Sequence, residues 1–275
     1  MLKIAVAQLA LSTKDIESNF QSTLNAINSA STQEVNLLVL PELVNSGYVF
    51  ENYSEAEKNS WYLDGAEIAE WKDLSKKLSL VIVAGVNLRL RKEKLSNAAV
   101  IIDNGEILGV YEKAHLYGNE PDYFEPGNNF PLVVDTSVGR IATMICYDIE
   151  FPEWVRYVLL QGAQILALPT NWPETGLPKK PIVMEVVRVQ AAASQNKLVI
   201  AACDRTGSEN GIDWVGQSVI VNSDGIIEKI SMPNQVDFLV ADIELPVDDS
   251  IGPRNSIKAD RRTDLYQLNF MKNIL

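Results

Sequence analysis

The chain has 275 residues, of which 47% are hydrophobic and 22% are charged, a composition typical of a globular protein with a substantial core. A net charge of −12 argues against a nucleic-acid partner, because the chain offers no basic face to neutralise phosphates. No uninterrupted run of about 18 apolar residues is present, so we expect no membrane-spanning segment and no membrane partner.

Cysteine and histidine are too rare for a disulfide framework or for a zinc site built from both. The chain has two cysteines, Cys146 and Cys203, and one histidine, His115. So few cysteines fit a reduced, cytoplasmic setting. The apolar run at the N-terminus is short and partly alternates with polar residues, and we interpret it as a first strand rather than a signal peptide.

In chain order, short β-branched runs alternate with longer segments of helical periodicity. The first half predicts strand 3–10, helix 14–30, strand 36–40, helix 67–78, strand 81–87, and a hairpin of strands 95–102 and 106–113 joined by an Asn-Gly turn. The second half predicts hairpin strands 132–135 and 140–146, helix 152–161, strand 165–169, a helix ending near residue 195, strand 198–203, paired strands 218–222 and 226–230, and strand 238–245.

Strand–helix alternation mixed with hairpins predicts an α/β fold in which helices cover mixed sheets. The chain shows no low-complexity linker, no break in composition and no repeat, so we expect one domain over residues 1–250. Residues 251–275 are polar and irregular in pattern. They predict a C-terminal arm that reaches a partner subunit.

Three segments place a reactive side chain beside a predicted strand end, where sites collect in parallel-type sheets. Glu42 follows an apolar strand in LLVLPELVNSGY. Lys113 ends a strand in GVYEKAHLYGNEPDYFEPG, with Glu120 seven residues later. Cys146 closes a strand in RIATMICYDIEFPEWVR and precedes a helix start. Taken singly, each has an ordinary alternative: a solvated glutamate, an edge lysine and a small buried cysteine.

Together, these segments resemble the motifs of the nitrilase superfamily of carbon–nitrogen hydrolases. The shared features are PEL with its glutamate, a lysine followed by x-His-Leu and a downstream F-x-PG, and C-Y-D-x-x-F-P-E. Their order and spacing also match, and the resemblance extends from Lys3 to about Leu245. Within the family, the Cys146 segment and the PTNWP stretch look most like amidases that act on simple amides.

The resemblance implies an α-β-β-α sandwich that dimerises to an eight-layer α-β-β-α-α-β-β-α core. It also implies a catalytic triad of Glu42, Lys113 and Cys146, with Glu120 as a second glutamate beside them. Because no cluster of His, Cys and carboxylates has a workable ligand spacing, we expect neither a metal nor an organic cofactor. A solvated loop acid is the alternative for Glu120. A Cys/His mechanism would need His115 as its base, but the family uses the histidine of this motif structurally.

The chemistry of amide cleavage suits these residue types. An amide carbonyl is a poor electrophile, so a thiolate nucleophile needs assistance. The ammonium of Lys113 near Cys146 would favour the thiolate and, with the backbone N–H of Tyr147, would stabilise the oxyanion. Glu42 would take the thiol proton, pass it to the departing amine, and then activate the water that hydrolyses the thioester.

Four residues are expected to bind the substrate: Tyr147, Asn171, Trp172 and, with weaker support, Tyr48. Asn171 and Trp172 follow the strand 165–169, where the family lines its pocket. A packed core aromatic is the alternative for Trp172. Cys203 is predicted to be a packing residue.

The sequence therefore predicts a hydrolase that releases ammonia from a small carboxamide. A nitrilase or an N-carbamoyl hydrolase would use the same residues, and a catalytically idle binding subunit is a more remote alternative. No arginine after Cys146 has a spacing that marks a carboxylate or carbamoyl clamp, which favours a neutral amide. We also expect a homodimer or higher oligomer, with helix 152–161 and the tail after Leu245 at its interface.

Overall fold

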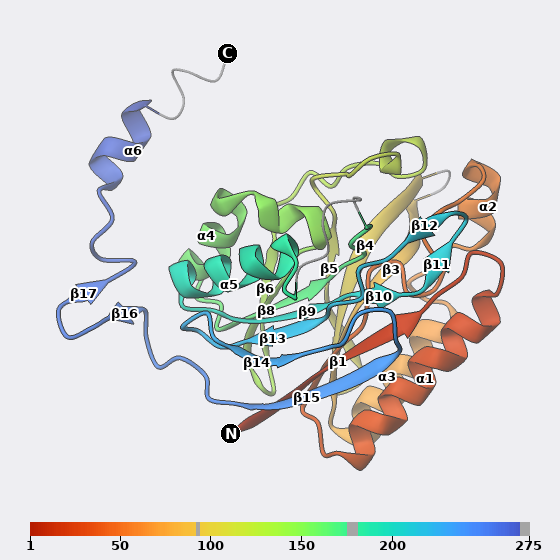
Figure 1. Ribbon diagram of the computed structural model, residues 1–275, viewed down its shortest axis with the longest axis horizontal. Coiled ribbons are helices and arrows are strands. Elements are labelled where there is room, and N and C mark those ends of the chain that lie inside the picture. The colour runs from red at the N-terminus through yellow and green to blue at the C-terminus, as the bar shows by residue number, and fades with distance from the viewer. Residues whose placement is uncertain (92–93, 175–180, 270–275) are drawn as a thin grey trace.

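Two β-sheets stack face to face in the computed structural model, and helices cover the outer face of each sheet (Figure 1). The structure describes residues 1–91, 94–174 and 181–269. This arrangement is the predicted α-β-β-α sandwich of two mixed sheets. In the described part of the chain, no helix is both long enough and apolar enough to cross a membrane.

The first sheet has the strand order β10-β1-β2-β3-β4-β5, and β15 also pairs with β1. Strands β1, β2 and β3 run parallel, whereas β4, β5 and β15 run antiparallel to their neighbours. The predicted Asn-Gly hairpin between β4 and β5 is confirmed, with φ of 48° at Asn104 and 81° at Gly105. The strands are β1 (Leu2–Ala10), β2 (Leu37–Val39), β3 (Val81–Arg91), β4 (Lys94–Asp103), β5 (Glu106–Glu112), β10 (Arg205–Thr206) and β15 (Asp237–Ile243).

The second sheet has the order β14-β13-β9-β8-β7-β6, with parallel strands β7, β8 and β9 at its centre. Its strands are β6 (Leu132–Thr136), β7 (Gly139–Thr143), β8 (Ile165–Pro169), β9 (Val199–Cys203), β13 (Val219–Val221) and β14 (Ile227–Ile230). A separate short hairpin joins β11 (Ser208–Glu209) to β12 (Ile212–Asp213).

Three apolar layers hold the sandwich together. Alternate side chains of one strand serve different layers, so Ile4 and Val6 of β1 lie between the sheets while Ala5 and Ala7 face the helices. The outer layer of the first sheet is covered by α1 (Ile16–Thr32) and α3 (Ala66–Leu78), and that of the second by α4 (Pro152–Leu160) and α5 (Met184–Asn196). Burial on both faces explains why the central strands read as continuous apolar runs.

The helix boundaries follow local sequence signals. The Asp15 side chain accepts a hydrogen bond from the N–H of Ser18 at 3.0 Å and so caps α1. Pro152 occupies the first turn of α4, as predicted. A further helix, α2 (Tyr53–Lys58), was not predicted, because six residues are too few to show a clear apolar period.

One predicted boundary is wrong at the position that matters most. We expected Cys146 to close a strand, but β7 ends at Thr143, and Cys146 instead opens a 3-10 turn, Cys146–Glu150. The reason lies in the backbone: Cys146 has φ of +46°, which a strand cannot contain. Asp148 stabilises the turn by accepting a hydrogen bond from the N–H of Ile145 at 3.0 Å.

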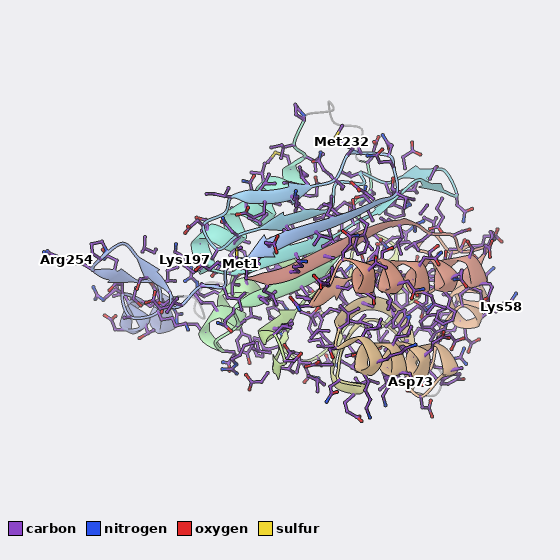
Figure 2. The ribbon with its side chains drawn as sticks, turned by 90° about the horizontal axis from the view of Figure 1, so that it is seen from below. Met1, Lys58, Asp73, Lys197, Met232 and Arg254 are labelled. Carbon is purple, nitrogen blue, oxygen red and sulfur yellow. The ribbon has the colours of Figure 1, made fainter. Side chains whose placement is uncertain are left out.

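The predicted interface elements are only partly as expected. The apolar residues Val155, Val158 and Leu159 of α4 pack inside the subunit, so they are not available to a partner. The arm is not wholly irregular either, since it forms β16 (Ser250–Ile251), β17 (Asn255–Ser256) and α6 (Thr263–Asn269). Figures 1 and 2 show this arm, marked by Arg254, standing away from the body of the molecule.

Candidate active site

Glu42 lies three residues after β2 and is completely buried. Its Oε1 accepts hydrogen bonds from Lys113 Nζ and from Asn97 Nδ2, each at 2.7 Å. Its Oε2 is buried and has no hydrogen-bond partner among the described residues. One oxygen is therefore fixed by two donors, and the other is left to receive a proton.

Lys113 directly follows β5, and its side chain is also completely buried. Its Nζ lies 2.7 Å from Glu42 Oε1 and 2.7 Å from Glu120 Oε1. An ammonium has three N–H donors, so two carboxylates leave one donor for another acceptor. The expected grouping of Glu42, Lys113 and Glu120 is thus present in the fold.

The charges of this cluster shift its pKa values in opposite senses. Burial raises the pKa of Glu42 to about 7, although the neighbouring Lys113 ammonium opposes that rise. Burial alone would lower the pKa of Lys113, but the carboxylates of Glu120 and Glu42 hold that pKa well above its ordinary value. Lys113 therefore stays an ammonium, while Glu42 can exchange a proton near neutral pH.

Glu120 opens a short 3-10 turn, Glu120–Asp122, and is buried rather than solvated. Besides Lys113, its Oε1 accepts a hydrogen bond from the hydroxyl of Tyr48 at 2.6 Å. Its Oε2 accepts from the backbone N–H of Tyr117 at 3.1 Å. The hydroxyl of Tyr48, a residue expected to contact substrate, is thus directed at this glutamate.

Cys146 is buried, with 7% of its surface exposed, and its Sγ donates to the backbone carbonyl of Asn171 at 3.7 Å. Burial and the charge of Glu42 raise the pKa of the Cys146 thiol well above its ordinary value, and Lys113 lowers it. The expected influence of Lys113 is therefore present, but it is outweighed. The resting group is a thiol, which needs a base to become a nucleophile.

Asp148 links the Cys146 turn to the Lys113 segment. One carboxylate oxygen accepts from the N–H of Ile145 at 3.0 Å and from the hydroxyl of Tyr111 at 2.8 Å. The other accepts from the N–H of His115 at 3.0 Å and lies 2.7 Å from His115 Nδ1. His115 also stacks on Phe151, with ring centroids 3.7 Å apart, which matches its expected structural use.

Sequence reasoning did not single out Asp148, Tyr111 or Asn97. A signal for Asp148 was present, since the aspartate stands two residues after Cys146 in the CYD motif. Asn97 and Tyr111 carried no local signal, because each lies inside an apolar strand pattern and reaches the site only through the pairing of β4 and β5.

The remaining expected pocket residues surround this cluster. Asn171 Nδ2 donates to the backbone carbonyl of Glu42 at 2.9 Å. Trp172 is buried in the same apolar layer as Cys146, and its backbone N–H donates to the Asp204 carboxylate at 2.9 Å. The ring of Tyr147 is half-buried and packs edge-on against Tyr117 at a centroid distance of 5.3 Å.

Cys203, by contrast, is a packing residue, as predicted. It is completely buried in β9 between the two sheets, and its Sγ donates to the carbonyl of Ala7 at 3.2 Å.

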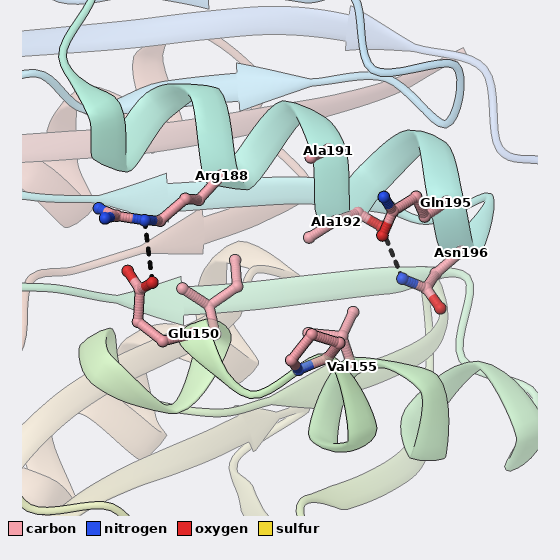
Figure 3. A pocket seen from close by; sticks show the side chains of 9 residues that line it. Glu150, Val155, Arg188, Ala191, Ala192, Gln195 and Asn196 are labelled. Atoms are coloured by element: carbon pink, nitrogen blue, oxygen red, sulfur yellow. Dashed lines mark hydrogen bonds and ion pairs between the residues drawn. The ribbon is translucent and has the colours of Figure 1, made fainter.

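A hollow between α4 and α5 lies apart from the cluster (Figure 3). It is lined by Val155, Arg188, Ala192 and other residues, and it contains none of the grouped acids, the lysine or the cysteine. Arg188 pairs there with Glu150 at 2.9 Å and with Glu185, three residues earlier on α5, at 3.5 Å. This hollow belongs to the scaffold.

Known proteins share both the sequence and the fold. The profile of the carbon–nitrogen hydrolases matches residues 3–248. A nitrilase from Pyrococcus abyssi is 30% identical over 97% of this chain and 99% of its own length. A 2-oxoglutaramate amidase from Bacillus subtilis is 30% identical over 86% of this chain and 88% of its own.

A solved structure of a mutant amidase from Nesterenkonia sp. AN1 has a TM-score of 0.78 and 26% identity, and the match covers 97% of this chain and 99% of that one. That structure is described as showing the Michael addition of acrylamide at the active-site cysteine. Fold and comparisons define a hydrolase with a cysteine nucleophile. The chain belongs to the carbon–nitrogen hydrolase family, within the nitrilase superfamily.

Proposed function

We propose that the protein is an amidase that releases ammonia from a small, neutral carboxamide through a thioester on Cys146. The observation that carries the proposal is the buried cluster in which Lys113 Nζ lies 2.7 Å from both Glu42 and Glu120. The unpartnered Oε2 of Glu42 supplies a base, and the charge of this residue is close enough to shift the pKa of the Cys146 thiol.

Acylation begins when Glu42 takes the proton of the Cys146 thiol and the sulfur attacks the amide carbon. The carbonyl electron pair moves to oxygen, which becomes an oxyanion. The third N–H of Lys113 and the backbone N–H of Tyr147 stabilise that charge. Because Lys113 is already held by two carboxylates, it is oriented before the substrate arrives.

The intermediate then collapses. The oxyanion re-forms the carbonyl, the carbon–nitrogen bond breaks, and Glu42 returns its proton to the nitrogen, which leaves as ammonia. A water molecule next gives a proton to Glu42 while its oxygen attacks the thioester carbon. Cleavage of the carbon–sulfur bond releases the carboxylic acid, and the sulfur recovers the proton from Glu42.

The charge around the site favours a neutral substrate. Two carboxylates surround the single ammonium of Lys113, so an anionic substrate would be repelled. Arg205 is close enough to Glu42 to interact with its charge, but its guanidinium is bound by Glu209 at 3.0 Å. That arginine is consequently not free to clamp a substrate carboxylate.

A panel of amides, nitriles and N-carbamoyl compounds, assayed by ammonia release, tests this proposal. We expect turnover of small neutral carboxamides. Activity on nitriles but not on amides would support a nitrilase, and activity confined to N-carbamoyl compounds would support an N-carbamoyl hydrolase. Folded protein that releases ammonia from no compound would overturn the amidase and favour an idle binding subunit.

A further inference from the structure

Residues 204–209 carry three buried charged groups that the mechanism above does not use. Asp204 and Arg205 are completely buried, and Glu209 is 6% exposed. Asp204 precedes β10, the edge strand of the first sheet that contains Arg205, and Glu209 lies in β11 of the separate short hairpin. A buried charge destabilises a protein unless it is paired and hydrogen-bonded. The partners of these three groups therefore indicate which segments the groups hold in place.

Glu209 binds the backbone of two loops. Its Oε1 accepts from the N–H of Thr13 at 2.8 Å. Its Oε2 accepts from the N–H of Tyr48 and from that of Val49, each at 2.8 Å, and also from Arg205 at 3.0 Å. One carboxylate therefore ties the loop that carries Tyr48 to the loop that carries Thr13.

The close approach of the Tyr48 loop to the Glu209 carboxylate requires a glycine at position 47. Gly47 has φ of +70°, and a Cβ at that position would lie 2.4 Å from Glu209 Oε1 and 2.5 Å from the nitrogen of Thr13. A side chain at residue 47 would thus separate the loop from Glu209. The glycine permits the contact that the carboxylate makes.

The ring of Tyr48 is held by Trp214, whose own ring is contacted by Arg205. It packs edge-on against Trp214 at a centroid distance of 5.2 Å, and the guanidinium of Arg205 lies 4.7 Å from the centre of the Trp214 ring. From this position the Tyr48 hydroxyl donates to Glu120 at 2.6 Å, and Glu120 in turn accepts from Lys113. A continuous set of contacts joins Glu209 to the active-site lysine.

We propose that Glu209, paired with Arg205, is a positioning residue that sets the Tyr48 hydroxyl on Glu120 and thereby fixes Glu120 against Lys113. This inference rests on the proposed function, in which Lys113 has a catalytic task. Glu209 itself touches no reacting atom. Its hydrogen-bonded route to Lys113 runs through Tyr48 and Glu120, and this route is what an experiment can measure.

A double-mutant cycle tests that route. Glu209→Gln retains the shape but can offer only one accepting oxygen, so it loosens the loop, while Tyr48→Phe removes only the hydroxyl. We expect each single variant to lower kcat about tenfold with a smaller change in KM, and the double variant to lose no more than about tenfold in total. Independent losses that multiply to about a hundredfold in the double variant would overturn the proposal.

Two further variants serve as controls for folding and for the loss of a buried acid. Arg205→Met combined with Glu209→Gln removes both members of the buried ion pair, so it serves if Glu209→Gln alone does not fold. Asp103→Asn is a matched control, because Asp103 is also a buried acid that binds a loop. Its carboxylate accepts hydrogen bonds from the backbone N–H of Ser137 at 2.7 Å and from the Ser137 hydroxyl at 3.0 Å, and neither group belongs to the cluster. We expect Asp103→Asn to change thermal stability but not kcat.

A crystal structure of the Glu209 variant gives a readout that needs no turnover. We expect the Tyr48 hydroxyl to move out of hydrogen-bonding range of Glu120. A contact that stays near the present 2.6 Å would contradict the positioning role. If wild-type protein hydrolyses no amide but this contact is lost in the variant, the proposed function fails while the positioning role stands.

Discussion

Among single residues, the proposed chemistry depends most on the buried carboxylate of Glu42, whose two oxygens have different surroundings. Asn97 and Lys113 both bind Oε1 of Glu42, and its Oε2 stays unpartnered. Burial raises the pKa of this glutamate to about 7, whereas an exposed glutamate would be too weak a base for a thiol whose pKa is itself raised. Two donors hold one oxygen in place, while burial raises the pKa of the carboxyl group enough to make it a usable base.

The pH dependence of activity follows from this pKa. Glu42 must be ionised to take the thiol proton, so kcat/KM for a neutral amide should rise as the pH increases through about 7 and level off above it. Asn97→Ala removes a hydrogen bond that lowers the pKa of Glu42, so the rise should move to higher pH. A flat profile through neutral pH, or a shift to lower pH in the Asn97 variant, would contradict this assignment.

Glu42→Gln and Lys113→Met should impair catalysis for different reasons. The glutamine retains the hydrogen bonds but cannot move protons, and we expect kcat to fall about a thousandfold, within the roughly 10²–10⁴ typical of a general base. Lys113→Met removes an oxyanion donor, which typically costs about 10²–10³ in kcat. Stopped assays of ammonia release would measure both losses.

Alkylation by iodoacetamide separates the two roles. Lys113 lowers the pKa of the Cys146 thiol and Glu42 raises it, so Lys113→Met should react more slowly at neutral pH while Glu42→Gln should still react readily. The rate of mass gain at Cys146 is the measurement. Slower alkylation of the glutamine variant with an unchanged rate for Lys113→Met would show that the roles are reversed.

At the scale of elements, the site depends on a turn that breaks a strand. Cys146 has φ of +46°, an uncommon conformation for a residue other than glycine, and Asp148 offsets this by binding Ile145, Tyr111 and His115. The same carboxylate therefore joins the turn after β7 to the segment after β5. Both active-site segments are fixed relative to each other by one side chain.

Asp148→Asn should disturb both segments. Both carboxylate oxygens of Asp148 accept hydrogen bonds, but an asparagine has only one accepting oxygen. Its NH₂ group would therefore face one of the present donors. We expect a fall in kcat of about tenfold or more and a loss of stability of about 1–3 kcal/mol, the usual cost of an unsatisfied buried group. Thermal unfolding and ammonia release would measure these effects. Asp135→Asn, whose carboxylate is 82% exposed, is the control, and equal effects in both variants would contradict the account.

The sequence predicted the elements better than the boundaries around the site. Periodicity and turn residues located the strands β8 and β9 and the β4–β5 hairpin, because these features are encoded locally. The positive φ of Cys146 was missed, since its turn is fixed partly by tertiary hydrogen bonds from Tyr111 and His115 to Asp148. Asn97 was missed because its role arises from pairing across the sheet.

At the scale of the whole molecule, the exposed apolar side chains point to self-association. The α4–α5 side exposes Leu160, Met184 and Val187, each at 37% or more, and the arm exposes Val247 at 99% and Ile251 at 54%. Because the arm stands away from its own subunit, it covers neither its own apolar side chains nor those of the α4–α5 side. Both groups stay in water unless another surface covers them. We propose that a second copy of the chain covers them.

Light scattering tests this proposal. The 30.5 kDa chain should have at least twice its own mass at micromolar concentration. Truncation after Leu245 should shift the protein toward monomer, because it removes the arm. A full-length protein that is only monomeric at this concentration would contradict the predicted homodimer.

Ammonia release by Cys146→Ala, assayed beside the active wild-type protein and Cys203→Ala, is the most direct test of Cys146 as the nucleophile. Both cysteines are buried, but only Cys146 interacts with the charges of Glu42 and Lys113. We predict that Cys146→Ala folds and releases no ammonia, whereas Cys203→Ala retains activity. Turnover by folded Cys146→Ala would contradict the assignment of Cys146 as the nucleophile.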